Sequence, residues 1–142
     1  MAAASFNEEF EKMLMNSEAG RPATLNNTPL RTLIENRSIN DYKKDGAAKA
    51  RSAINYFTKA GLIDKTLAEI SGDTVAFKNA MVKATEETSS SQGNNNQKYL
   101  SGIMEAAGHP SSWPRNTLLA ELGDKPAKEM FDLTVDRPSN ST

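Results

Sequence analysis

SINDYKKDGAAKARSAINYFTKAGLIDKTLAEISGDTVAFKNAMVKATEETSSSQGNNNQKYLSGIMEAA spans residues 38–107, and this stretch decides the fold. Its first apolar pattern has spacings of three or four, the period of an amphipathic helix, at Ala47, Ala50, Ile54 and Phe57. Ser38 followed by Asp41 is a variant of the capping box that begins helices. Gly61 suits the position just after a helix. We therefore predict a helix over 39–60.

A second helix is predicted over residues 73–87. Asp73 or Thr74 can begin it, because a side-chain oxygen at that position can accept hydrogen bonds from the free amides of the first turn. The short apolar segment from Lys65 to Ile70 precedes it and carries no helix prediction of its own.

A loop and a third helix are predicted to follow. Residues Thr88–Asn96 contain no apolar side chain, so nothing in them can be ordered by burial, and a mobile loop is expected. Asn95 or Asn96 would then cap a helix over 96–107. The exposed amides at that helix start would make a site suited to a phosphate.

Shorter patterns flank the central stretch. Further helices are expected near 5–17, 29–36, 116–122 and 125–132, and residues 21–27 are expected as a polar linker. No segment shows sustained alternation typical of a strand, so the predicted fold class is all-α, a compact helical bundle. The predicted organisation is an N-terminal helical extension (1–36), a central bundle (37–108), short C-terminal helices packing on it (109–133) and a disordered tail (134–142).

A hydrophobic core follows from these helical faces. Its predicted members are Leu33, Ile34, Ile54, Phe57, Leu62, Leu67, Ile70, Val75, Phe77, Met81, Leu100, Ile103 and Met104.

Composition narrows the possible functions. The 142 residues include no cysteine, which excludes disulfides and thiol chemistry and predicts a reducing, cytoplasmic location. No apolar run approaches the roughly 20 residues of a membrane helix, so no membrane partner is expected. The formal net charge is −1. It divides unevenly, with ten Lys/Arg against seven Asp/Glu in residues 37–100, a local surplus that can mark a nucleic-acid face or be ordinary scatter.

Motifs for catalysis are missing from the sequence. The single histidine, His109, precedes a proline in a connector and is expected as a surface residue rather than a metal ligand. Neither GxGxxG nor GxxxxGK[ST] occurs, so a nucleotide-phosphate cradle has no support. We predict no enzyme activity, no cofactor and no metal site.

The central stretch resembles the core-binding domain of tyrosine recombinases, the phage-integrase family. In that SAM-like N-terminal domain, a basic helix precedes a pattern similar to Leu67-Ala68-Glu69-Ile70-Ser71-Gly72-Asp73-Thr74-Val75. A polar loop then leads into a pattern similar to Asn95-Asn96-Gln97-Lys98-Tyr99-Leu100-Ser101. The resemblance covers about residues 40–107.

The resemblance implies a four-helix core that clamps one face of duplex DNA through its backbone. Carried over by position, the DNA-binding residues would be Lys49, Arg51, Asn96, Gln97 and Lys98. The family's catalytic residues lie in a following domain for which this chain is too short, so a non-catalytic DNA-binding role is expected. The alternative from the sequence is a helical protein-interaction or assembly module without nucleic acid. Two features of the sequence favour this alternative: the near-neutral net charge and the apolar stripes of the terminal helices. Those stripes could also mediate self-association.

Overall fold

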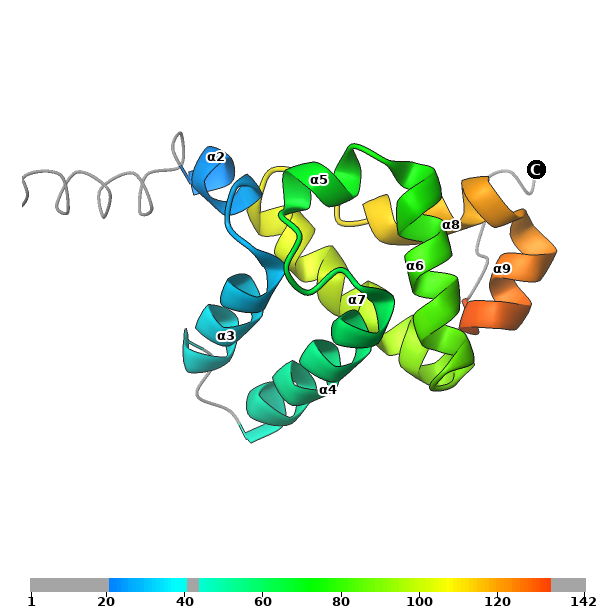
Figure 1. Cartoon of the computed structure of the whole chain (residues 1–142), viewed down its shortest axis with the longest axis horizontal. Coiled ribbons are helices and arrows are strands. Elements are labelled where there is room, and N and C mark those ends of the chain that lie inside the picture. Colours follow the sequence, from blue (N-terminus) through cyan, green and yellow to red (C-terminus); the bar gives the residue numbers. More distant parts are fainter. Residues whose placement is uncertain (1–20, 41–43, 134–142) are drawn as a thin grey trace, which may run out of the picture.

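Eight helices make up most of the computed structural model (Figure 1), which describes residues 21–40 and 44–133, with side chains for 22–37 and 46–133. They are α2 (Arg21–Asn26), α3 (Leu30–Asn40), α4 (Lys44–Ala60), α5 (Leu67–Ser71), α6 (Thr74–Glu86), α7 (Ser90–Ala106), α8 (Trp113–Leu122) and α9 (Asp124–Phe131). No strand occurs in these ranges, which hold one isolated bridge between Pro29 and Thr66. The all-α prediction is confirmed. The helix expected at 5–17 and the tail at 134–142 lie outside the described residues.

Four of these helices form the centre of the fold. Helix α4 packs against α6 and α7, α6 packs against α7 and α8, and α7 packs against α8. Helix α3 adds to α4 on one side, and α9 adds to α7 and α8 on the other. In Figure 1, α3 and α4 lie at the lower left and α9 lies at the right end. No helix among the described residues is long and apolar enough to cross a membrane.

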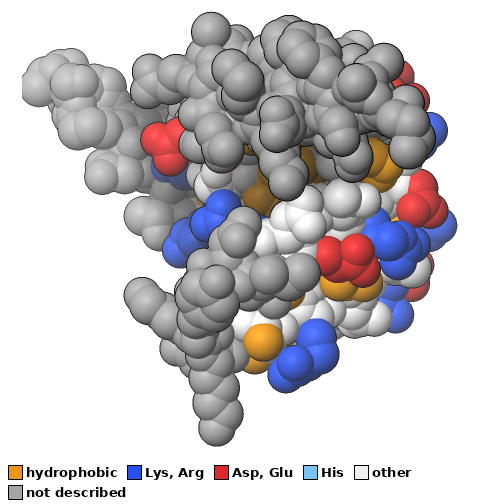
Figure 2. All heavy atoms as spheres, turned by 90° about the vertical axis from the view of Figure 1, so that its left-hand side faces the viewer, with side chains coloured by type: hydrophobic (Ala, Val, Ile, Leu, Met, Phe, Trp, Pro, Cys, Tyr) orange, Lys and Arg blue, Asp and Glu red, His pale blue; other side chains and the backbone are white. Residues whose placement is uncertain are grey.

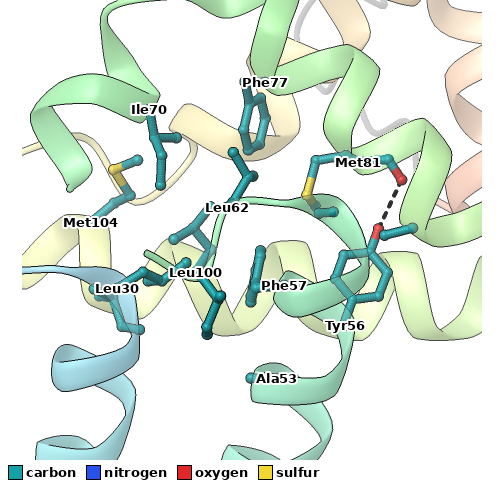
Figure 3. Close-up of a cluster of buried hydrophobic side chains, with 14 of the residues drawn as sticks. Leu30, Ala53, Tyr56, Phe57, Leu62, Ile70, Phe77, Met81, Leu100 and Met104 are labelled. Atoms are coloured by element: carbon teal, nitrogen blue, oxygen red, sulfur yellow. Dashed lines mark hydrogen bonds between the residues drawn. The ribbon is translucent and has the colours of Figure 1, made fainter. Parts of the chain in front are cut away.

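The core is one continuous cluster of buried apolar side chains. Figure 3 shows its central part, where Leu30, Phe57, Phe77 and Leu100 point toward one another from four different helices. The cluster extends through Leu118 to Phe131 and Leu133.

Most of the predicted core is buried, and two positions differ from the prediction. Ile54 is only partly buried against the cluster. The prediction for Val75 was wrong, because its side chain is 51% exposed. Val75 precedes the buried Phe77 by two residues, or about 200° around a helix, so it lies on the opposite face of α6.

A buried hydrogen-bond group joins α4 to α6. The Tyr56 hydroxyl donates to the carbonyl oxygen of Met81 at 3.0 Å (Figure 3) and also bonds the Thr85 hydroxyl. Since the Tyr56 proton goes to Met81, Thr85 is the donor in the second bond. Burial raises the pKa of Tyr56 to about 12, an effect that the Thr85 hydrogen bond partly opposes.

Two predicted helix boundaries are confirmed at the residue. Helix α6 begins after Asp73, whose carboxylate accepts from the Ala76 amide at 3.0 Å. Helix α4 ends at Ala60, and Gly61 follows with φ of 76°, a left-handed conformation that favours glycine.

The capping prediction for Ser38 was wrong, because Ser38 lies inside α3. That helix begins at Leu30, where the amides of Leu30 and Arg31 donate to the carbonyls of Lys65 and Ile63 at 2.8 and 2.9 Å. Once the first turn of a helix has formed and packed, adding a further residue requires little free energy. Helix α3 therefore continues through the polar residues to Asn40.

The predicted linker 21–27 is instead the helix α2. Its Asn26 side chain donates to the carbonyl of Ala107 at 2.9 Å, and its oxygen bonds Nε2 of His109 at 2.7 Å. His109, predicted as a surface residue, is therefore half-buried and holds α2 to the end of α7. These bonds join residues far apart in the sequence, which is why local composition did not indicate the helix.

The short segment before α6 also forms a helix. Helix α5 begins with a capping box: the Thr66 hydroxyl accepts from the Glu69 amide at 3.2 Å, and the Glu69 carboxylate accepts from the Thr66 amide at 2.9 Å. The bond from the Thr66 backbone holds the pKa of Glu69 below its usual value.

The largest difference from prediction is the start of α7. Residues Thr88–Asn96 were expected as a mobile loop, but α7 begins at Ser90, and the Ser89 hydroxyl accepts from the Gln92 amide at 3.1 Å. The polar side chains of this segment are ordered by hydrogen bonds and by packing against α4, α6 and α9.

Candidate nucleic-acid interface

A hollow of about 420 Å³ lies between α3, α4 and α7. We call it the basic hollow. Its lining residues are Arg37, Gly46, Lys49, Ser52, Asn95, Asn96, Lys98 and Tyr99. The spacing of three that separates Gly46, Lys49 and Ser52 places them on one face of α4. Asn95, Lys98 and Tyr99 form the facing stripe of α7, for the same reason.

Arg37 reaches the hollow from α3. Its guanidinium carbon lies 5.4 Å from the centre of the Tyr99 ring, a distance typical of a cation–π contact. The guanidinium also lies against Gly102, where an added Cβ would be 2.8 Å from one terminal nitrogen and 3.1 Å from the other. Tyr99 and Gly102 of α7 therefore define the place of this cation.

A polar network holds the two longest helices together beside the hollow. The Ser52 hydroxyl of α4 donates to Oε1 of Gln92 on α7 at 3.0 Å. The Asn96 side-chain nitrogen donates to the Gln92 carbonyl at 2.9 Å and to its Oε1 at 3.2 Å. Both amide protons of Asn96 are thus used within the protein. Asn96 supports the wall of the hollow and has no side-chain donor left for a ligand.

The charge of the hollow is positive. Arg37, Lys49 and Lys98 are exposed cations, and no carboxylate is found among the lining residues whose side chains the structure describes. The ion pair between Arg31 and Asp64, at 3.3 Å, lies outside the hollow, and no described carboxylate forms an ion pair with the three cations of the hollow. An uncompensated group of cations with nearby polar groups is suited to an anion.

The structure brings together three of the five residues predicted to bind DNA. Lys49, Asn96 and Lys98 line the hollow. Arg51 is exposed outside it, because two residues along a helix turn its side chain about 200° away from Lys49. Gln97 is 3% exposed, and its amide donates to the Asn94 side chain at 3.1 Å.

The predicted phosphate site at a helix start was wrong for these residues. Asn96, Gln97 and Lys98 lie in the interior of α7, whose free amides are near Ser90 instead. Asn96 is 2% exposed and faces the protein. Of the residues predicted to bind DNA, Lys49 and Lys98 place their positive charges in the basic hollow.

Arg37 and Tyr99 line the hollow but were not predicted as parts of the site. Tyr99 was named only within the pattern that carries the resemblance, and it is half-buried, with its ring under Arg37. One sequence feature could have indicated the role of Tyr99: Gly102 follows it by three residues, so the two lie on the same face of a helix, and the missing side chain of Gly102 leaves space beside the ring. Nothing local to Arg37 indicated which helix its side chain would reach.

The charges on the surface are mixed where the structure describes it in Figure 2. On the face shown in Figure 2, the coloured basic side chains lie among acidic, polar and hydrophobic ones. Groups of three or more His, Asp or Glu side chains that could hold a metal ion are not found in the described ranges.

The fold and the hollow define an all-helical domain with a positively charged hollow between three helices. Comparison of the chain with protein-family models, with curated proteins and with solved structures finds no match.

Proposed function

We propose that this chain is a non-catalytic helical module that binds the phosphate backbone of duplex DNA. The observation that carries the proposal is the convergence of Arg37, Lys49 and Lys98 on one hollow without a described carboxylate. Cations on a rigid helical surface supply most of the affinity for a DNA backbone.

The resemblance to the core-binding domain of tyrosine recombinases supports the same proposal. That resemblance implies a four-helix core over about residues 40–107, where the structure has α4, α5, α6 and α7; α4, α6 and α7 pack against one another, and α5 packs against α6. In the resembled family the chemistry lies in a separate following domain, so the proposed role is binding alone. A DNA-binding role and the lack of cysteine suit a cytoplasmic location.

The size of the cation group predicts the character of the binding. Each phosphate contact contributes about −0.9 to the slope of log affinity against log salt concentration, so three cations predict a slope of roughly −3. Contacts to phosphate do not distinguish bases, so the three cations should bind duplexes of different sequence alike.

The test is the binding of labelled duplexes, measured by fluorescence anisotropy across a range of salt concentrations. Lys98→Ala and Lys49→Ala should each weaken binding to every duplex and reduce the salt slope by about one. Lys128→Ala is the matched control, because Lys128 is an exposed lysine on α9 at the other end of the molecule (Figure 1). A parent protein that binds no duplex at low salt would overturn the proposal.

Arg51→Ala tests which face of α4 meets the DNA. Arg51 and Lys49 are both exposed on α4, but only Lys49 lines the basic hollow. If the hollow is the contact, Arg51→Ala should change affinity much less than Lys49→Ala. The reverse order would move the interface to the other face of the helix.

The alternative function is a helical protein-interaction or assembly module. The mixed charge of the face in Figure 2 favours it, because a surface that follows DNA over a long distance is usually basic throughout. Light scattering and cross-linking of the full chain would reveal self-association. A strict monomer that binds duplex DNA would exclude self-association as its role.

A further inference from the structure

We propose that the basic hollow holds one phosphate group and that Arg37 is its main ligand, positioned in advance by Tyr99 and Gly102. The inference rests on the proposed function and deepens it: a phosphate group is the part of the ligand that this hollow recognises. A phosphodiester of DNA and the phosphate of a small molecule share this chemistry.

Arg37 is held by the helix that it approaches rather than by its own helix. The guanidinium lies over the Tyr99 ring at 5.4 Å. It also occupies the space that a Cβ at residue 102 would need, with 2.8 Å between that position and the nearest guanidinium nitrogen. A glycine inside a long helix weakens the helix, and here its missing side chain gives Arg37 its place.

No described carboxylate forms an ion pair with Arg37, so its N–H groups can meet a ligand. The Tyr99 ring lies on one side of the guanidinium, at 5.4 Å from its carbon, and the N–H groups of a guanidinium point outward in its plane. Two parallel N–H groups match two oxygens of a phosphate, so the contact can be bidentate. An arginine already held in place loses less conformational freedom when it binds.

The two facing helices supply the remaining charge. Lys49 on α4 and Lys98 on α7 line the same hollow as Arg37. The nearby Ser52 and Asn96 are committed to Gln92, so they hold the wall in place rather than the ligand. The hollow therefore combines one oriented cation with two flexible ones, and a phosphate at its mouth can meet all three.

The experiment separates the position of Arg37 from its charge. Gly102→Ala leaves every charge in place but puts a methyl group where the guanidinium lies. Binding of a labelled duplex at low salt should weaken about tenfold in Gly102→Ala and in Arg37→Ala, the loss expected when one charge-assisted contact is removed. The double variant should bind no more weakly than Arg37→Ala, since Gly102 acts only through Arg37. The far-UV spectrum and the melting temperature should show that Gly102→Ala remains folded, because alanine favours the helix.

A second probe, inorganic pyrophosphate, identifies the source of the phosphate. If the duplex binds the parent and Gly102→Ala binds it equally well, the positioned-arginine inference is wrong and the DNA-binding proposal stands. If the duplex does not bind but pyrophosphate binds with the same dependence on Arg37 and Gly102, the inference stands and the DNA-binding proposal is wrong. If the parent binds neither probe, both are wrong.

Discussion

Gly93 lies where α7 packs tightly against α6 and α9. A Cβ added there would meet the Thr85 hydroxyl of α6 and would lie 2.8 Å from Cδ1 of Phe131 on α9. No larger residue fits without moving one of these neighbours. This glycine lies in the segment that was predicted as a loop, and packing inside a helix requires it.

Gly93→Ala should destabilise the protein by about 1–3 kcal/mol, the usual cost of overpacking a core. This loss should outweigh the gain of up to about 1 kcal/mol that alanine brings to a helix interior. The measurement is the free energy of unfolding in urea. Gly102→Ala is the control, because the atoms it meets are the flexible end of Arg37, and its stability should be unchanged or higher. Equal stability of the two variants would contradict the packing at Gly93.

The raised pKa of Tyr56 predicts that the free energy of unfolding depends on pH in the alkaline range. Burial raises the pKa of Tyr56 to about 12, so the folded protein keeps the phenol proton where the unfolded chain, with its ordinary pKa of about 10, loses it. The contribution of Tyr56 is fully present below pH 10. Between pH 10 and 12 it should decrease by about 1.4 kcal/mol per pH unit.

Comparison with Tyr56→Phe isolates this effect from other groups that titrate at high pH. Below pH 10 the variant should be less stable by about 1–3 kcal/mol, because a buried hydroxyl that bonds Met81 and Thr85 is lost. The difference in unfolding free energy between parent and variant should shrink as the pH rises from 10 to 12. A difference that stays constant over this range would show that Tyr56 is not the buried group described here.

At the scale of the element, the first turns of α7 show a helix made from residues with low helix propensity. Its segment SSQGNNNQ is rich in Ser, Gly and Asn, which favour turns when nothing else acts on them. Asn96 bonds the carbonyl of Gln92 four residues earlier, Gln97 bonds Asn94, and Ser52 holds Gln92 from another helix. The helix is therefore stabilised by its side-chain hydrogen bonds and by its neighbours.

Ser89→Ala should cost about 1 kcal/mol, because it removes the hydroxyl that accepts from the Gln92 amide at the start of α7. Ser91→Ala is the matched control, since Ser91 is exposed within the helix and alanine suits that position. Native-state hydrogen exchange gives an independent measurement. The amides of residues 94–97 should be protected from exchange, and fast exchange there would restore the loop prediction.

At the scale of the whole molecule, one core connects α3 at one end to α9 at the other. The buried cluster contains Leu30, Leu100 and Phe131, which lie on three different helices. A shared core of this kind makes the described helices depend on one another, so they should unfold together.

Leu100→Ala should lower the free energy of unfolding by about 2–5 kcal/mol, because Leu100 is completely buried in this cluster. Ile54→Ala should cost less, since Ile54 is only partly buried. Val75→Ala is the control, and its change should stay within about 0.5 kcal/mol because the side chain faces solvent. Urea unfolding followed by both circular dichroism and tryptophan fluorescence should show one transition in each protein. Separate transitions from the two probes would contradict a shared core.

Local sequence patterns predicted the features that one segment can specify alone. The period of three to four residues identified α4, and Asp73 and Gly61 marked the start of α6 and the end of α4, which the structure shows at the same residues. The cation excess and the resemblance pointed to Lys49 and Lys98, which line the basic hollow. A helical period, a capping residue and a local net charge each depend on a single segment, so they can be predicted from the sequence of that segment alone.

Contacts between distant segments decided the features of the fold and of the basic hollow that local patterns did not predict. Helix α2 is held by a bond from Asn26 to Ala107, the start of α7 is ordered by α4, α6 and α9, and Arg37 is placed by residues of α7. The sequence by itself determined an all-helical chain with a basic centre. Only the tertiary structure decided which polar residues are buried and which cations meet, because a hydrogen bond or a close approach between residues far apart in the chain outweighs the weak local preference of either segment.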